Sequence, residues 1–144
     1  MLCPMTSYRR LKRPGASYFF TVCLEDRDST LLVDQINALR AAYAATLREL
    51  PVLCPAIVVL PNHLHAIWTE PAGEVNYSER WRRIKARFSH SIGRAETVCP
   101  SKQRKREAGQ WQRRFWEHAL RDEADFLAAM AACRIDPVTH GLVT

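Results

Sequence analysis

Two hydrophobic periodicities divide the first third of the chain into a strand and a helix. Residues 16–24 are rich in aromatic and β-branched side chains and follow Pro14-Gly15, which is typical of a strand entered from a turn. From residue 34 onward, hydrophobic residues recur three or four positions apart instead. This spacing predicts an amphipathic helix over residues 34–49 with Asp34 as its N-cap. Its apolar face consists of Ile36, Leu39, Tyr43, Leu47 and Leu50.

The rest of the chain predicts a hairpin, a second helix, another strand and a final helix. Short apolar runs at 55–61 and 63–70 flank a Pro-Asn turn and predict two paired strands. A helix is expected from residue 78, and a stretch without periodicity at 93–110 is expected to be a loop. Residues 113–120 predict a strand, and 122–135 predict a last helix that ends before Pro137. The apolar face of the second helix consists of Trp81, Ile84, Phe88 and Ile92.

This order of elements indicates an α+β fold. A strand-helix-strand-strand-helix-strand-helix order predicts a ferredoxin-like antiparallel sheet with helices on one face and an additional C-terminal helix. The chain has 144 residues, of which 47% are hydrophobic and 25% charged. This length and composition are typical of one globular domain covering residues 1–144.

Two histidines interrupt the apolar pattern of the predicted strand at 63–70. Alternate side chains of a strand point to the same side, so His63 and His65 are expected to share one face. Two neutral imidazoles placed in this way can bind one divalent metal ion, if a third ligand comes from elsewhere in the fold. The alternative is a structural pair of histidines on a half-exposed strand. The motif alone leaves both interpretations open.

Positive charge is concentrated in one part of the chain. The sequence has 21 Lys and Arg against 15 Asp and Glu, a formal net charge of +6 and a pI near 9.4. Residues 80–114 contain twelve basic residues and two acidic ones, Glu96 and Glu107. Such a surplus is typical of a protein that binds nucleic acid, although a solvated basic surface would have the same composition.

Several of these basic residues are candidates for contacts with phosphate groups, which would give an affinity that falls with salt. Phe115 and Trp116 follow two arginines; we expect both aromatic side chains in the core, with stacking on unpaired bases as the alternative. The candidate phosphate-binding residues are Arg9, Arg10, Arg80, Arg82, Arg83, Lys85, Arg87, Arg113 and Arg114.

The cysteines and the N-terminal residues indicate a reducing compartment. The five cysteines are scattered and show no C-x-x-C spacing, which argues against a disulfide framework or a zinc ribbon. The first 15 residues contain no apolar run typical of a secretory signal, and no stretch approaches the roughly 20 apolar residues of a membrane span. We therefore expect a cytoplasmic protein that does not enter a membrane.

Four blocks of the sequence resemble one known family. They read "VVLPNHLHAIWTEP", "ERWRRIKARFSH", "WQRRFWEHALRDEADF" and "IDPVTHGLV". In this order they resemble the REP-associated tyrosine transposases, which belong to the HUH single-strand nuclease superfamily. The resemblance implies a ferredoxin-like fold and a partner that is single-stranded DNA folded into palindromic hairpins. It also implies strand cleavage and joining by a tyrosine hydroxyl, aided by Mg²⁺ or Mn²⁺.

Carried onto this sequence, the resemblance assigns a metal site and a vacant nucleophile position. His63 and His65 match the histidine pair, and Asp136 takes the position of the third ligand, where a carboxylate suits a hard cation. The tyrosine of the family precedes that ligand by four residues, but here this position is Ala132. The neighbouring Cys133 would point about 100° away around the helix, so we do not expect it to act as a substitute.

The resemblance thus implies a monomeric domain that binds hairpin DNA and a metal ion but does not cleave through a tyrosine. Relatives usually continue beyond the last block, so we expect a C-terminal segment to be missing here. Two alternatives remain open. One is a non-catalytic regulator that binds nucleic acid, including structured RNA, with purely structural histidines. The other is a metal site that activates water as the nucleophile.

Overall fold

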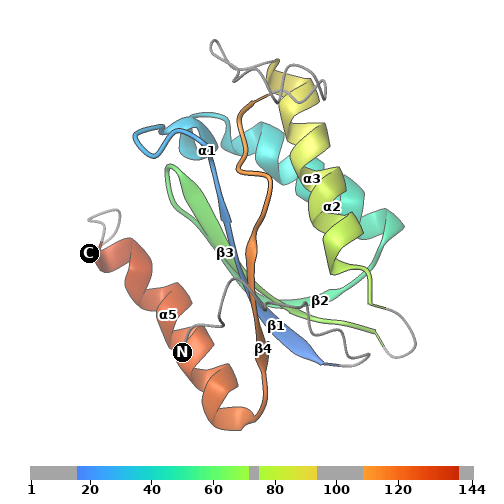
Figure 1. The fold of residues 1–144 in the computed structure, drawn as a ribbon, viewed down its shortest axis with the longest axis vertical. Helices are drawn as coiled ribbons and strands as arrows, with labels where there is room; N and C mark the ends of the chain where they lie inside the picture. Colours follow the sequence, from blue (N-terminus) through green and yellow to red (C-terminus); the bar gives the residue numbers. More distant parts are fainter. Residues whose placement is uncertain (1–15, 72–74, 94–108, 140–144) are drawn as a thin grey trace.

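The computed structural model describes residues 16–71, 75–93 and 109–139, and for residues 134–139 it describes the backbone alone. Figure 1 shows the arrangement of its helices and strands. The strands are β1 (Ser17–Cys23), β2 (Leu53–Val59), β3 (His63–Thr69) and β4 (Trp116–Leu120). The helices are α1 (Leu31–Asp34), α2 (Ile36–Glu49), α3 (Tyr77–Ile92) and α5 (Glu123–Thr139).

The strands of the described part form one antiparallel sheet in the order β2-β3-β1-β4. β3 follows β2 through a tight turn and then pairs with β1, so the hairpin places β3 between β2 and β1. In the register of the central pair, Thr21 lies opposite His65 and Cys23 lies opposite His63. The prediction of an α+β fold built on an antiparallel sheet is confirmed.

The two faces of the sheet are covered differently (Figure 1). α2 and α3 cover one face, where even-numbered strand residues such as Phe20 and Trp68 pack with Trp81 and Phe88 in the main core. These four aromatic side chains are fully buried, because strand alternation and helical spacing both direct them inward. α5 crosses the opposite face and forms a smaller core around Ile67. The histidine pair lies on this second face.

Three details differ from the sequence-based predictions. A short helix, α1, precedes α2, and Asp34 ends α1 instead of capping α2, whose N-cap is Gln35. α5 continues past Pro137 to Thr139, so the prediction that Pro137 ends the helix is wrong. Pro137 has no backbone N–H to donate within the last turn, yet the helix continues for two residues beyond it. Among the described helices, none is long and apolar enough to cross a membrane.

Candidate metal and nucleic-acid site

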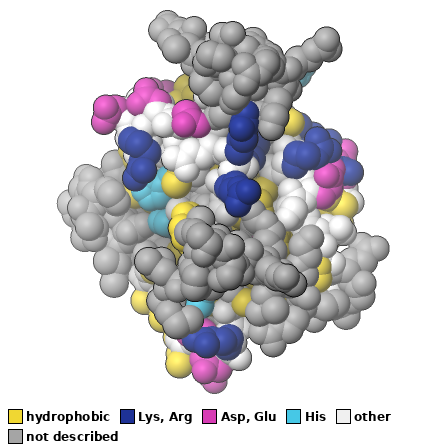
Figure 2. All heavy atoms as spheres, viewed as in Figure 1, with side chains coloured by type: hydrophobic (Ala, Val, Ile, Leu, Met, Phe, Trp, Pro, Cys, Tyr) yellow, Lys and Arg dark blue, Asp and Glu magenta, His cyan; other side chains and the backbone are white. Residues whose placement is uncertain are grey.

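The two histidine side chains lie side by side on the face of the sheet that α5 crosses. Their ring centroids are 4.9 Å apart, and the ring planes are nearly perpendicular at 80°. Both residues are half-buried, whereas Leu64 between them is fully buried in the main core. The prediction that His63 and His65 share one face is therefore confirmed. Figure 2 shows histidine side chains reaching the surface in this view, with Lys or Arg side chains near them.

A chain of hydrogen bonds orients the ring of His63. The side-chain Nδ2 of Asn62 donates to the backbone carbonyl of Arg27 at 2.5 Å, which directs Oδ1 of the same amide toward His63. Nδ1 of His63 lies 2.6 Å from this oxygen and must donate to it. In the neutral ring the lone pair is then on Nε2, which is the tautomer that a metal-binding histidine with this kind of support adopts.

Neighbouring strand β1 orients the ring of His65. Nδ1 of His65 is 2.9 Å from the hydroxyl of Thr21, which lies directly opposite it in the sheet. The ring of Phe19 stacks on the same imidazole at a centroid distance of 5.2 Å and an interplanar angle of 20°. These contacts restrict the rotation of the ring, as expected for a side chain that has to present one nitrogen in a fixed direction.

Sequence reasoning missed both orienting residues. Asn62 was visible only as a turn residue, although a polar amide directly before a His-x-His motif is a usable signal for an orienting group. Thr21 lies 44 positions before His65 in the sequence. Its role depends on strand register, which the sequence pattern does not specify.

Helix α5 carries the predicted nucleophile position and third-ligand position. It begins after β4 and runs toward the end of the sheet where the hairpin of β2 and β3 lies (Figure 1). Ala132 is exposed, whereas Ala129 and Cys133 are buried against Ile67. The side chain of Asp136 lies outside the described residues, so its role as a ligand stays a prediction. Within residues 16–71, 75–93 and 109–133, no three His, Cys, Asp or Glu side chains form a group that could hold a metal ion.

Arg80, which is predicted from the sequence as a candidate for contacts with phosphate groups, belongs instead to the core. Its side chain is 1% exposed and forms an ion pair with Glu70 at 2.9 Å. Its Nε donates to the carbonyl of Leu50 at 2.8 Å, and the guanidinium lies 5.0 Å from the centre of the Trp68 ring. A buried cation requires such a set of partners. Arg80 therefore cannot reach a phosphate on the protein surface in this fold.

Three other arginines of α3 form ion pairs that connect α3 to α2 or to its own first turn. Arg82 and Arg83 each pair with Glu79 at 2.6 Å. Arg83 and Arg87 also pair with Glu49 of α2, at 3.0 and 2.6 Å. Hydrogen bonds from Arg82 and Arg83 lower the pKa of Glu79 to about 2. The contacts of these arginines with phosphates stay a prediction, and any such contact would compete with the carboxylates.

The remaining candidate residues lie near strand β4 or outside the described residues. Lys85 donates from Nζ to the backbone carbonyls of Gln112 and Arg113, at 3.1 and 3.2 Å, so it anchors the segment that enters β4. Arg113 and Arg114 are exposed. Arg9 and Arg10 lie outside the described residues.

Phe115, directly before β4, and Trp116, the first residue of β4, lie in different environments. Phe115 packs against the main core, which confirms its predicted position. Trp116 is 45% exposed, so the expectation that it lies in the core is wrong. The difference follows from strand alternation, because neighbouring side chains on a strand point to opposite faces.

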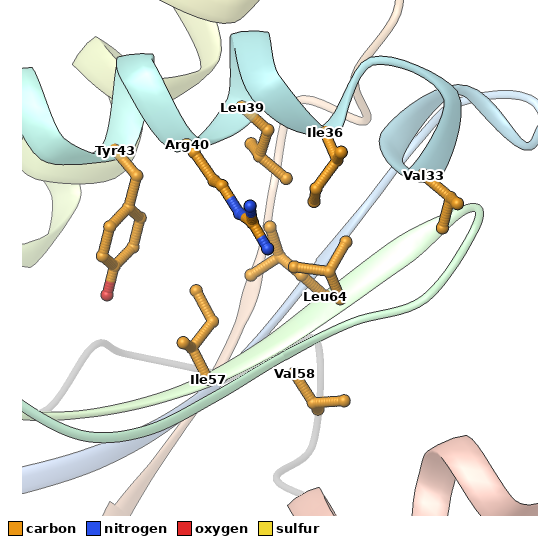
Figure 3. Close-up of a pocket in the computed structure, with 9 residues that line it drawn as sticks. Val33, Ile36, Leu39, Arg40, Tyr43, Ile57, Val58 and Leu64 are labelled. Atoms are coloured by element: carbon orange, nitrogen blue, oxygen red, sulfur yellow. The ribbon is translucent and has the colours of Figure 1, made fainter. Parts of the chain in front are cut away.

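A separate apolar cavity of about 540 Å³ lies between α2 and the strands β2 and β3 (Figure 3). Ile36, Leu39, Ile57 and Leu64 line it, and the side chain of Arg40 extends across it. The histidine pair is not part of its lining. Apart from Arg40 and Tyr43 its lining is apolar, and it contains no histidine, cysteine or carboxylate that could bind a metal ion, so we do not regard it as the functional site.

The fold and the site define a class of α+β proteins: one antiparallel sheet has two helices on one face and, on the face that α5 crosses, two oriented histidines. No protein-family model matches the chain. The REP-associated tyrosine transposase of Escherichia coli K12 is 41% identical over 139 residues, covering 96% of this chain and 76% of that protein. A relative from Haemophilus influenzae is 38% identical over 140 residues, covering 96% of this chain and 80% of that protein.

Solved structures agree with these relatives. A REP-associated tyrosine transposase bound to a REP hairpin superposes with a TM-score of 0.83 at 41% identity, covering 96% of this chain and 76% of that one. A structure from Deinococcus radiodurans has a TM-score of 0.54 at 11% identity, covering 87% of this chain and 94% of that one, and this likeness supports the fold alone. The chain belongs to the REP-associated tyrosine transposase family.

Proposed function

We propose that this protein binds single-stranded DNA that folds into hairpins, acting as a monomer with a bound Mg²⁺ or Mn²⁺, and that it lacks tyrosine-dependent strand cleavage. The observation that carries the proposal is the oriented histidine pair on the sheet face beneath α5. It is supported by a relative, 41% identical, that was solved bound to a REP hairpin. Because the chain belongs to a family of transposases, we place its DNA binding in DNA transposition.

The donor groups of the site fit a hard divalent cation. Asn62 directs the lone pair of neutral His63 to Nε2, and Thr21 holds His65 beside it at a ring-centroid distance of 4.9 Å. Asp136 belongs to α5, and its side chain would add a carboxylate oxygen. This is the kind of ligand that Mg²⁺ and Mn²⁺ prefer. When bound, the ion would offset negative charge on a DNA phosphate.

The protein's own residues then position the phosphate but do not attack it. A phosphotyrosine link needs a hydroxyl group, and the methyl group of Ala132 provides none. Tyr18, Tyr43 and Tyr77 lie on the other side of the sheet in or against the main core, so they do not replace it. Burial and the neighbouring Cys54 thiol also raise the pKa of Tyr43 far above its ordinary value, which makes its hydroxyl a poor nucleophile.

The proposal is tested by binding measurements with and without metal ions. We expect fluorescence anisotropy to show tighter binding of a labelled hairpin oligonucleotide than of a linear duplex of equal composition. We also expect Mn²⁺ to raise the melting temperature of the protein. His63→Gln and His65→Gln should lose the effect of Mn²⁺, because each removes an imidazole ligand without leaving a cavity. Asn37→Ala, a substitution of an exposed residue of α2 on the other side of the sheet, is the control.

Two results would contradict this proposal. If the protein does not distinguish the DNA hairpin from the duplex, hairpin recognition is wrong. If Mn²⁺ changes neither stability nor binding, and both histidine variants behave like the unaltered protein, the histidines are structural. The second result, obtained together with tight hairpin binding, would favour the non-catalytic regulator.

A further inference from the structure

Trp116 lies on the same face of the sheet as the histidine pair. In the β1–β4 register Trp116 is opposite Thr21, and in the β1–β3 register Thr21 is opposite His65. Residues directly opposite each other in antiparallel strands point to the same face, so His65, Thr21 and Trp116 form one row across three strands. Adjacent strands are about 4.8 Å apart, which places the backbone of Trp116 roughly 10 Å from that of His65.

The exposure of Trp116 is unusual in this protein. Trp68 and Trp81 are fully buried and Trp111 is 7% exposed, whereas Trp116 is 45% exposed. Tryptophan is a large apolar side chain that folding normally removes from water. An indole left on a surface in this way offers a flat face on which a nucleic-acid base can stack.

The segment around Trp116 is held firmly on several sides. Lys85 donates to the backbone carbonyls of Gln112 and Arg113, a few residues before Trp116, and the backbone N–H of Gln112 donates to the carbonyl of Cys23 at 3.0 Å. Phe115 is packed in the main core on the opposite face. Because neighbouring residues alternate, anchoring Phe115 inward directs Trp116 outward onto the face of the histidines. The indole is thus a preorganised surface and not a side chain on a loose loop.

Charge next to Trp116 favours a polyanionic strand as the partner. The exposed Arg113 and Arg114 lie three and two residues before it in sequence, and β4 is an edge strand of the described sheet. The whole chain has a formal net charge of +6. An aromatic surface next to basic side chains is the combination used to hold single strands, since the bases stack while the cations contact phosphates.

We propose that Trp116 stacks on an unpaired base of the single-stranded DNA next to the hairpin and so directs the strand across β1 toward His65. Arg113 and Arg114 contact the phosphates on either side of that base. This inference rests on the proposed function and adds to it a binding residue on β4 and a path for the strand.

The test compares two DNA hairpins that differ only in an unpaired flanking strand. Trp116→Ala should bind the flanked hairpin roughly tenfold or more weakly than the unaltered protein, with little change for the hairpin without a flank. Trp116→Phe should recover part of the loss, because a phenyl ring also stacks. Leu53→Ala is the matched control, since Leu53 is a 71% exposed hydrophobic residue on the opposite edge strand. Addition of the flanked DNA should also quench tryptophan fluorescence in the unaltered protein but much less in Trp116→Phe.

The outcomes separate this inference from the proposed function. If the unaltered protein binds neither hairpin, both are overturned. If it binds the hairpins but Trp116→Ala loses nothing on the flanked one, or loses affinity equally for both, the stacking role is wrong and hairpin binding stands. If the loss occurs with flanked RNA and not with flanked DNA, the assignment to single-stranded DNA is overturned.

Discussion

Arg80 and Arg82 are two residues apart on α3, yet their environments are opposite. Arg80 is 1% exposed and pairs with the buried Glu70, whereas Arg82 is 66% exposed and pairs with Glu79 at the surface. Removing one partner of a buried ion pair leaves an uncompensated charge, which costs about 3–5 kcal/mol. Arg80→Ala should therefore lower the free energy of unfolding by about that amount.

Arg82→Ala is the matched control for this prediction and should change the free energy of unfolding little, because an exposed ion pair contributes little. Urea denaturation of both variants measures the difference. Equal and small effects of the two substitutions would show that the Arg80–Glu70 pair does not stabilise the core.

Asn62 allows a second prediction at the level of one residue. Its amide connects the Arg27 carbonyl to Nδ1 of His63, so Asn62→Ala removes the group that sets the tautomer of the ring. Loss of such a supporting group typically weakens metal binding by roughly 10–100-fold. Titration calorimetry with Mn²⁺ measures this effect, with Asn37→Ala on the exposed surface of α2 as the control. An unchanged affinity of Asn62→Ala for Mn²⁺ would show that Asn62 does not support the metal site.

Single residues show what the sequence can and cannot predict. The shared face of His63 and His65 follows from strand alternation alone and is confirmed. The burial of Arg80 was not predictable, because its partner Glu70 directly follows strand β3 and only the three-dimensional packing brings the two residues together. The exposure of Trp116 depends on the register of β4, which a hydrophobic pattern of five residues leaves open.

Apart from α1, the helices and strands were predicted to within a few residues, and two helices were correctly expected on one face of the sheet, but the position of α5 was not predicted. The helical spacing of Trp81, Ile84 and Phe88 identifies α3 and its buried face. α5 has a similar length and a weaker apolar stripe, and nothing in its sequence shows that it crosses the face opposite to α2 and α3. That placement decides which face holds the candidate site.

The difference in burial predicts that α5 opens more readily than α3. Tyr77, Trp81, Ile84 and Phe88 of α3 are fully buried, whereas Ala129 and Cys133 of α5 are small and keep 8% and 6% exposure. Helices with few buried apolar contacts open with a smaller free energy. Hydrogen exchange with mass spectrometry should show faster exchange for amides of residues 123–133 than for those of α3. Equal protection in both helices would contradict this.

Strand β4 allows a prediction about pH. Burial raises the pKa of Glu117 from its ordinary value of 4.5 to about 7. Between these two values the folded protein holds a proton that the unfolded chain has released. Stability contributed by this group therefore falls as the pH rises from about 4.5 to about 7 and stays low above that range.

Glu117→Gln should remove this contribution. Urea denaturation at several pH values should show a smaller loss of stability with rising pH in Glu117→Gln than in the unaltered protein. Glu123→Gln on the exposed start of α5 is the control and should keep the original pH dependence. Parallel curves for Glu117→Gln and the unaltered protein would show that Glu117 does not titrate in this range.

As a whole, the molecule has the fold of its family, and we propose one departure from that family, at the position of the nucleophile. The fold agrees with that of a REP-associated tyrosine transposase, and the relatives match over 96% of the chain. The position that we assign to the tyrosine nucleophile is Ala132, an exposed residue of α5. Because it is exposed, a tyrosine there can be accommodated without overpacking the small core around Ile67.

The central claim is that the site has lost its nucleophile and kept its other parts. A denaturing gel tests it by detecting covalent adducts between protein and hairpin single-stranded DNA in the presence of Mn²⁺. The comparison includes the unaltered protein, Ala132→Tyr and, as the control without a hydroxyl group, Ala132→Phe. We predict an adduct with Ala132→Tyr alone. An adduct with the unaltered protein, or none with Ala132→Tyr on DNA that it demonstrably binds, would contradict the claim.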